Sequence, residues 1–178
     1  MEKQSETLSP ALTADIEKLA LDVLQTASAT NQTLATAESC TGGLVASLLT
    51  DVEGCGHCFD RGFVTYSDDA KSALLGVPVH LLECEGAVSH AVAEAMVLGA
   101  LSRSNADVAV AITGYAGPGE PGSEPGLVYI AVAGRADDPC VTEHHFGNGG
   151  RGEVRLNALR VTLELMLFKL RAPDHVTS

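Results

Sequence analysis

The sequence has no tryptophan, and its aromatic residues together make up only 4% of the chain. Hydrophobic residues still amount to 46%, so we expect a core of mostly small aliphatic side chains, chiefly alanine, valine and leucine. Basic residues are also scarce: 11 Lys and Arg stand against 23 Asp and Glu, for a formal net charge of −12. Because nucleic-acid binding needs clustered cations, we expect no nucleic-acid partner. An anionic substrate must therefore meet locally placed cations or backbone N–H groups.

Membrane and targeting signals are missing as well. No apolar run approaches the roughly 20 residues that a membrane-spanning helix needs. The first six residues also lack the basic and apolar regions of a signal peptide. We therefore expect a cytoplasmic protein without a membrane partner. The five cysteines, an odd number, then indicate free thiols rather than a disulfide framework.

The spacing of apolar residues predicts an α/β fold in one domain. With 178 residues, we expect this domain to span 11–171, with flexible tails at 1–10 and 172–178. Helical spacing, with Ser67 and Ser89 as N-caps of the third and fourth helices, predicts helices at 14–30, 41–50, 68–75, 90–102 and 151–170. Apolar runs predict strands at 33–37, 61–66, 107–112, 127–133 and 140–146. Strand–helix alternation followed by a late hairpin predicts a three-layer α/β/α sandwich with a mixed five-stranded sheet.

Residues 36–43, Thr-Ala-Glu-Ser-Cys-Thr-Gly-Gly, lie between the first predicted strand and the second predicted helix. This position places the Ser39 hydroxyl at the carboxyl edge of the sheet, where open α/β folds bind ligands. The following glycines let a substrate approach the backbone, and a helix start offers unpaired N–H groups. Ser39 is thus a candidate nucleophile, although a helix N-cap is the alternative. Cys40 is a rival nucleophile, which we expect instead to be buried and inert.

A serine nucleophile needs a base. None of the six histidines comes with a nearby aspartate that would suggest a Ser-His-Asp triad. A lysine with a lowered pKa is the other option. Of the four lysines, only Lys71 follows closely after a strand end, so it is the candidate base. An ordinary solvated helix lysine is the alternative reading of Lys71.

Two further patterns bear on cofactors and ligands. Cys55 and Cys58 have metal or redox spacing, but zinc needs a second ligand pair that the sequence lacks. A redox motif of this kind opens a helix after a strand, whereas this one lies in the loop before a predicted strand. We therefore predict no metal site. Glycine-rich loops at 114–126 and 147–152 offer N–H groups that can hold a phosphate. The second loop carries Arg151 and leads to Arg155, which makes it the better anion candidate; flexible connectors are the alternative.

Four motifs together resemble one known family. They are residues 36–43, residues 61–67 followed by Lys71, residues 86–89 (Gly-Ala-Val-Ser) and residues 113–118 (Thr-Gly-Tyr-Ala-Gly-Pro). In this order and spacing they are similar to the CinA C-terminal domain family, over about residues 16–170. The resemblance implies a single α/β/α domain that converts nicotinamide mononucleotide to nicotinate mononucleotide and ammonia, with no metal or organic cofactor. It also favours a homo-oligomer, a dimer or higher.

The resemblance also implies roles for particular residues. Ser39 is implied as the nucleophile and Lys71 as the base, and we expect Tyr66 to orient Lys71 or to donate to the substrate. N–H groups around residues 41–43 are expected to hold the oxyanion, and arginines and the glycine loops the phosphate. The expected substrate-binding residues are Thr41, Gly42, Gly43, Arg61, Thr113, Gly114, Gly117, Arg151 and Arg155.

This sequence departs from the family pattern at Tyr115, where the family often has a smaller residue, and in the glycine-rich loop at 147–152. Both departures bear on the shape of the pocket and on substrate preference. The alternative function is a paralogue that binds nucleotides or assembles without catalysis. Because a module that only binds needs no paired nucleophile and base, Ser39 and Lys71 together favour the enzyme.

Overall fold

The computed structural model describes residues 12–52, 54–117, 122–135 and 137–172. The predicted tails lie outside these ranges, apart from Ala172. The elements run in the order α1 (Ala14–Thr30), β1 (Leu34–Glu38), α2 (Leu44–Thr50), η2 (Gly56–Cys58), β2 (Phe59–Val64), α3 (Asp68–Ala70), η3 (Lys71–Leu75), α4 (Val79–Glu85), α5 (His90–Ser102), β3 (Val108–Gly114), β4 (Leu127–Gly134), β5 (Cys140–His145) and α6 (Arg151–Arg171). Here η2 is a 3-10 turn and η3 a π-helical turn.

The five strands form one mixed sheet in the order β2-β1-β3-β4-β5. Strand β1 is parallel to both β2 and β3, whereas β4 is antiparallel to β3 and to β5. The predicted fold class, the mixed sheet and the late hairpin are therefore confirmed. In the parallel part, Glu38 pairs with Val64 on one side and with Ile112 on the other. The carboxyl ends of β1, β2 and β3 thus meet at one edge of the sheet.

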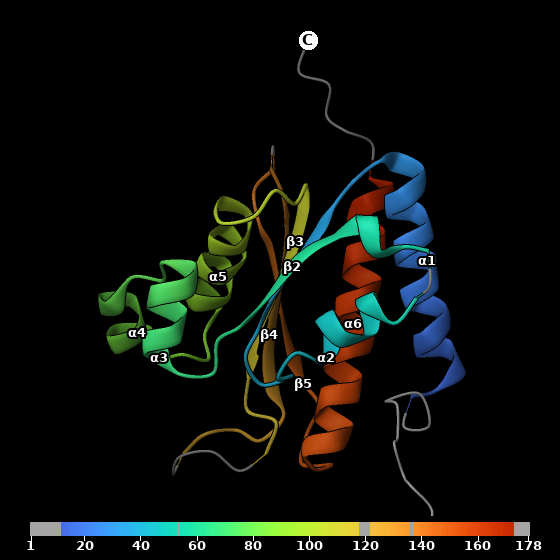
Figure 1. The fold of residues 1–178 in the computed structure, drawn as a ribbon. Helices are drawn as coiled ribbons and strands as arrows, with labels where there is room; N and C mark the ends of the chain where they lie inside the picture. Colours follow the sequence, from blue (N-terminus) through green and yellow to red (C-terminus); the bar gives the residue numbers. More distant parts are fainter. Residues whose placement is uncertain (1–11, 53, 118–121, 136, 173–178) are drawn as a thin grey trace, which may run out of the picture.

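Helices cover both faces of the sheet (Figure 1): α1, α2 and α6 lie on one side, and α3, α4 and α5 on the other. Alternation along the strands sorts side chains by size between these layers. Leu34, Val110 and Ile112 face the α1/α6 side, whereas alanines at 35, 37, 109, 111, 131 and 133 face α5. The small side chains let α5 pack close to the sheet.

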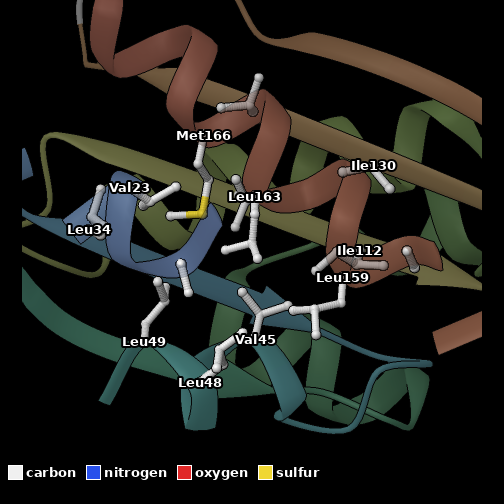
Figure 2. Packing of buried hydrophobic residues seen from close by; sticks show 14 of the residues in the cluster. Val23, Leu34, Val45, Leu48, Leu49, Ile112, Ile130, Leu159, Leu163 and Met166 are labelled. Carbon is white, nitrogen blue, oxygen red and sulfur yellow. The ribbon is translucent and has the colours of Figure 1, made fainter. Parts of the chain in front are cut away.

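The larger core lies between the sheet and the α1/α6 layer. Figure 2 shows Val23 of α1, Val45 and Leu49 of α2, and Leu163 and Met166 of α6 packed against strand residues. All five of these side chains are fully buried. This packing fixes α2 against β1, and so fixes the turn between them.

Local signals explain several element boundaries. Ser67 Oγ accepts from Ala70 N at 3.1 Å and Ser89 Oγ from Val92 N at 3.3 Å, so both predicted N-caps are confirmed. The helix predicted to begin at residue 41 begins instead at Leu44, because residues 39–43 form a separate turn. Among the described helices, none has the length and apolar character needed to cross a membrane.

Candidate active site

A pocket of about 350 Å³ lies where the carboxyl ends of the strands meet. Its volume falls at the lower end of the roughly 300–1,000 Å³ typical of small-molecule sites. Segments that are far apart in the sequence contribute to it: the turn after β1, the segment after β2, the loop before α5, the end of β3 and the start of α6. The lining residues are Ser39, Cys40, Tyr66, Lys71, Ala87, Val88, Thr113, Gly114, Tyr115, Ala116, Gly117 and Arg151.

Ser39 and Lys71 are in direct contact inside this pocket. Lys71 Nζ lies 3.2 Å from Ser39 Oγ, although 32 residues separate the two in sequence. The fold produces this contact because Ser39 follows β1 and Lys71 follows the neighbouring parallel strand β2. Ser39 is only 7% exposed and lines the pocket. The structure therefore brings together the two residues that the sequence nominated as nucleophile and base.

Lys71 is one of the most deeply buried side chains in the molecule, at 1% exposure. Besides Ser39 Oγ, its Nζ donates to the carbonyl oxygen of Thr65 at 3.1 Å and to that of Tyr66 at 3.4 Å. No carboxylate of the described residues lies within ion-pair distance of Nζ. Burial lowers the pKa of Lys71, and nearby Asp68 only partly opposes this shift. These surroundings favour a neutral amine more than ordinary lysine surroundings do.

Cys40 lines the same pocket but differs from Ser39 in its environment. Its side chain is 4% exposed, and burial raises the pKa of the thiol to about 11. A thiol is a weak nucleophile until it ionises. The expectation that Cys40 is buried is confirmed, and its raised pKa agrees with an inert thiol.

The turn after Ser39 differs from the predicted oxyanion site. Gly43 N donates to Glu38 Oε2 at 3.1 Å, and Gly42 N donates to the carbonyl oxygen of Ser39 at 3.1 Å. Both N–H groups are occupied, so the expectation that Gly42 and Gly43 donate to an oxyanion is wrong for this conformation. Among the described residues, neither the N–H nor the buried hydroxyl of Thr41 has a hydrogen-bond partner. Thr41 thus keeps unpaired donors, but it is 2% exposed and is not among the residues that line the pocket.

Tyr66 contributes to the site in a different way from the one expected. Its side chain lines the pocket and is 68% exposed, whereas its carbonyl oxygen accepts from Lys71 Nζ. The contact that orients Lys71 therefore comes from the backbone of Tyr66. The phenol is left free to meet a substrate at the mouth of the pocket.

Arg61 lies away from the pocket. Its Nε donates to Asp60 Oδ2 at 2.8 Å, and its NH1 donates to the carbonyl oxygen of Arg103 at 3.0 Å. Arg61 pairs in register with Ala35, three residues before the strand end at Glu38. Arg61 is therefore not among the residues that line the pocket, nor among the groups that shift the pKa of Lys71. It ties β2 to the end of α5.

The end of β3 forms the opposite wall of the pocket. Thr113 Oγ1 donates to the carbonyl oxygen of Ala87 at 2.6 Å and so ties the loop before α5 to the sheet. Gly114 packs closely against β4: a Cβ there would lie 2.7 Å from the carbonyl oxygen of Leu127. Gly117 is buried and also lines the pocket. All three predicted residues therefore stand at the pocket wall.

Two arginines of α6 approach the site from the third side. Arg151 lines the pocket and is exposed, with its guanidinium beside Gly117. Arg155 is half-buried, and its Nε donates to the carbonyl oxygen of Cys40 at 2.7 Å. Its guanidinium also lies against Gly42. Arg155 thus braces the turn that carries Ser39, whereas Arg151 has the exposed charge suited to an anionic group.

The remaining candidates do not join the site. In the part of the chain that the structure describes, no cluster of His, Cys, Asp and Glu could hold a metal ion. All five cysteines are free, as expected, and Cys58 is buried with its Sγ 3.8 Å from the carbonyl oxygen of Leu24. His57 Nε2 lies 3.2 Å from Ser28 Oγ, and His57 precedes β2 whereas Lys71 follows it. None of the described histidines lines the pocket.

Sequence reasoning missed the role of Glu38. This carboxylate is completely buried and accepts from the backbone N–H groups of Gly43, Val45 and Ala46 at 2.8–3.1 Å. One signal was available: an acidic residue ends an otherwise uncharged strand, a few residues before a helix whose first residues carry no capping side chain. The contact between the Thr65 carbonyl oxygen and Lys71 could not be predicted from the sequence, because every residue has a backbone carbonyl.

The fold and the site together define an α/β/α protein with a serine–lysine pair in a pocket at the carboxyl edge of its sheet. A family model described as the CinA C-terminal domain matches residues 16–170. The chain belongs to the CinA C-terminal domain family.

Individual relatives agree with this assignment. The chain is 47% identical over 133 residues to the nicotinamide-nucleotide amidohydrolase PncC of Enterobacter agglomerans, covering 74% of this chain and 80% of that protein. It is 48% identical over 137 residues to a CinA-like protein of Mycolicibacterium gilvum, of which the matched region covers only 32%. The crystal structure of the competence/damage inducible protein CihA from Agrobacterium tumefaciens superposes with a TM-score of 0.86 at 44% identity, covering 90% of this chain and 98% of that one. The chain spans only between 25% and 33% of the length of the first curated relatives that it matches.

Proposed function

We propose that the protein is an amidohydrolase that converts nicotinamide mononucleotide to nicotinate mononucleotide and ammonia, with Ser39 as nucleophile and Lys71 as base. The observation that carries the proposal is the 3.2 Å contact between Lys71 Nζ and Ser39 Oγ in a pocket where Lys71 is buried. The name of the Enterobacter relative supports the choice of substrate. The family match lies within residues 11–171, the single domain that we propose carries the activity.

The surroundings of Lys71 suit a base. A neutral lysine amine has two N–H donors and one lone pair. The carbonyl oxygens of Thr65 and Tyr66 can accept from the two donors, at 3.1 and 3.4 Å. The lone pair then points to the third neighbour, Ser39 Oγ, and accepts its hydroxyl proton. Because a base must be unprotonated to act, the lowered pKa of Lys71, caused mainly by burial, favours this arrangement.

The reaction then runs in two balanced halves. Ser39 Oγ attacks the carboxamide carbon as Lys71 takes its proton, and in this proposal the Thr41 N–H stabilises the oxyanion. When the carbon–nitrogen bond breaks, Lys71 gives that proton to the departing nitrogen, which leaves as ammonia. The acyl group then remains on Ser39 as an ester. Water attacks the ester, its proton passes through Lys71 to Ser39 Oγ, and nicotinate mononucleotide leaves.

The substrate's phosphate needs a cation in a protein with net charge −12. Arg151 is the arginine that both lines the pocket and is exposed, so we assign the phosphate to it. N–H groups at Gly114 and Gly117 are further contacts in this proposal. The exposed phenol of Tyr66, which also lines the pocket, is a further substrate contact in this proposal.

The test is ammonia release from nicotinamide mononucleotide by the wild type, Ser39→Ala and Lys71→Met. Both variants should lose at least about 10²-fold in kcat, the lower end of what a positioned base contributes. Lys18→Met, which removes an exposed lysine of α1, is the matched control and should keep full activity. Activity that survives Ser39→Ala contradicts the covalent mechanism. A wild type that binds the nucleotide tightly without turning it over favours the non-catalytic module instead.

A further inference from the structure

Glu38 is a completely buried carboxylate that touches no cation among the described residues. Burying a charge is costly unless hydrogen bonds replace its water. Three backbone N–H groups do so here: Gly43 and Val45 donate to Oε2, each at 3.1 Å, and Ala46 donates to Oε1 at 2.8 Å. Because both oxygens accept, the charged carboxylate matches the site better than an amide can.

These three N–H groups belong to the start of α2. The first turn of a helix leaves N–H groups without intrahelical partners, and a cap residue normally accepts from them. Gly43, at the cap position, has no side chain to do this. Glu38 takes that part from the end of β1, across the turn of residues 39–43. Its negative charge also suits the positive end of the helix.

Glu38 is also fixed on its backbone side. Its carbonyl oxygen accepts from Thr65 N at 2.8 Å, and the next N–H, that of Ser39, donates to the carbonyl oxygen of Ile112 at 3.0 Å. Thr65 in turn offers its carbonyl oxygen to Lys71 Nζ at 3.1 Å. One residue thus joins the strand end, the turn that carries Ser39 and the segment that holds Lys71.

We propose that Glu38 is a positioning residue, which keeps Ser39 Oγ in contact with Lys71 Nζ by tying the start of α2 to the end of β1. This inference rests on the proposed function. It also explains why the helix start does not serve as the oxyanion site: Glu38 occupies the N–H groups of residues 43, 45 and 46, and the Thr41 N–H stays available. Glu38 touches neither the substrate nor the reacting atoms, and its carboxylate does not line the pocket.

The decisive variant is Glu38→Gln. The amide keeps one acceptor oxygen and points an NH₂ group at an N–H that now lacks a partner, so the turn must shift. A misplacement of roughly 1 Å can cost about 10²-fold in rate. We therefore expect kcat for nicotinamide mononucleotide to fall by about this factor while KM is unchanged, because Arg151 and the end of β3, to which we assign substrate binding, lie on other segments. A rise in KM with kcat unchanged would contradict a positioning role.

A second readout does not depend on the substrate. A fluorophosphonate reacts with an activated serine: Ser39 Oγ bonds to phosphorus, fluoride leaves, and Lys71 takes the hydroxyl proton. Intact-protein mass spectrometry should show one label on the wild type, none on Ser39→Ala, and labelling slowed by about 10²-fold in Glu38→Gln. A wild type that is labelled but does not hydrolyse the nucleotide refutes the proposed substrate. The labelling rate of Glu38→Gln then still decides whether Glu38 positions Ser39.

The matched control separates position from general stability. Asp107 anchors the other end of β1, where its Oδ2 accepts from Thr33 N at 2.8 Å and from Thr33 Oγ1 at 3.0 Å. Asp107→Ala should therefore destabilise the fold without slowing labelling, when both variants are assayed well below their unfolding temperatures. Equal slowing by Asp107→Ala overturns the proposal, as does an unlabelled wild type. If Glu38→Gln does not fold, Glu38→Asp takes its place. Aspartate keeps the charge, but its side chain is one methylene too short to reach all three N–H groups, so labelling should again be slowed. Labelling of Glu38→Asp at the wild-type rate overturns the proposal.

Discussion

Burial lowers the pKa of Lys71, and the carboxylate of Asp68, three residues earlier in the same helical segment, opposes that shift. The two groups differ in exposure: Asp68 opens α3 on the surface, whereas Lys71 opens the π-helical turn η3 and is buried. π-Helical turns are often found at functional sites. A surface charge thus bears on the protonation of a base that is almost fully buried.

Replacing Asp68 by Asn should move the pH dependence of activity. Without the carboxylate, the pKa of Lys71 falls further. Since the amine acts only when it is neutral, activity is lost as pH falls through this pKa, so the acidic limb of kcat/KM should move to lower pH. The shift should stay below about one pH unit, because water screens an exposed charge. The measurement is a pH series of kcat/KM.

The control for this series is Asp69→Asn, which removes the adjacent exposed carboxylate. Asp69 is not among the groups that shift the pKa of Lys71. Its profile should match that of the wild type. A limb that moves to higher pH in Asp68→Asn, or that moves equally in both variants, contradicts Lys71 as the titrating base.

Replacing Lys71 by Met should change how stability depends on pH. The folded state holds the Lys71 proton more weakly than the unfolded state does, since the lysine pKa is lowered from 10.5. Between the folded pKa and 10.5, stability therefore rises with pH, because the unfolded chain binds more protons there. The free energy of unfolding of the wild type, minus that of Lys71→Met, should rise over this range. Urea unfolding at a series of pH values measures it.

The same series with Lys18→Met shows what an exposed lysine does. Lys18 is largely solvent-exposed and pairs with Asp22. Its removal should produce no comparable rise in the stability difference. If the difference between wild type and Lys71→Met is flat or falls with pH, burial does not disfavour the charged form of Lys71.

Gly99 of α5 controls the distance between this helix and the turn that carries Lys71. A Cβ at Gly99 would lie 2.1 Å from the carbonyl oxygen of Leu75, the last residue of η3. A backbone carbonyl cannot rotate away, so Gly99→Ala must push η3 from α5. We expect a loss of about 1–3 kcal/mol in stability, typical of overpacking, and a lower kcat. Thermal unfolding and the ammonia assay measure the two effects.

Gly152→Ala is the matched control. Gly152 also lies in a helix, α6, but a Cβ there would meet nothing within 4 Å. Alanine has the higher helix propensity, so this variant should gain up to about 1 kcal/mol and keep its activity. Gly99→Ala that is as stable and as active as the wild type argues against a tight contact at Leu75.

The elements that the sequence predicts well are those with local signals. Apolar spacing predicts α1 and α5 with both ends correct. Ser67 marks the start of α3 and Ser89 the start of α5, because each caps its helix. The resemblance nominates Ser39 and Lys71, and the fold places them in contact. Their catalytic roles stay predictions. The parallel pairing of β1 and β2 explains the contact, since residues that follow neighbouring parallel strands emerge at the same edge.

The features that the sequence does not predict depend on contacts between distant segments. Gly43 is unavailable to an oxyanion because a carboxylate five residues earlier turns back to it. Arg61 misses the pocket because its guanidinium reaches the end of α5, 42 residues away. Lys71 is oriented by backbone carbonyls, which every residue has and no motif marks. Such contacts follow only from the packed structure.

Arg151 offers a test of how the substrate's phosphate is held. Its exposed guanidinium lines the pocket beside Gly117, far in sequence from Ser39 and without a contact to it. Arg151→Met should therefore raise KM for nicotinamide mononucleotide and leave kcat unchanged. A hydrogen bond to a charged group contributes about 1.5–3 kcal/mol, which corresponds to roughly a 10- to 100-fold rise in KM. Steady-state kinetics of ammonia release measures both constants.

Nicotinamide riboside, which lacks the phosphate, shows whether the effect belongs to that group. If Arg151 holds the phosphate, the wild type should already use the riboside poorly, and Arg151→Met should not weaken it further. Arg171→Met removes an exposed arginine from the other end of α6 and should leave both substrates unaffected. If Arg151→Met weakens the nucleotide and the riboside equally, Arg151 acts on the part that they share, and the phosphate must be assigned to other groups. A fall in kcat with KM unchanged would instead place Arg151 with the groups that position Ser39.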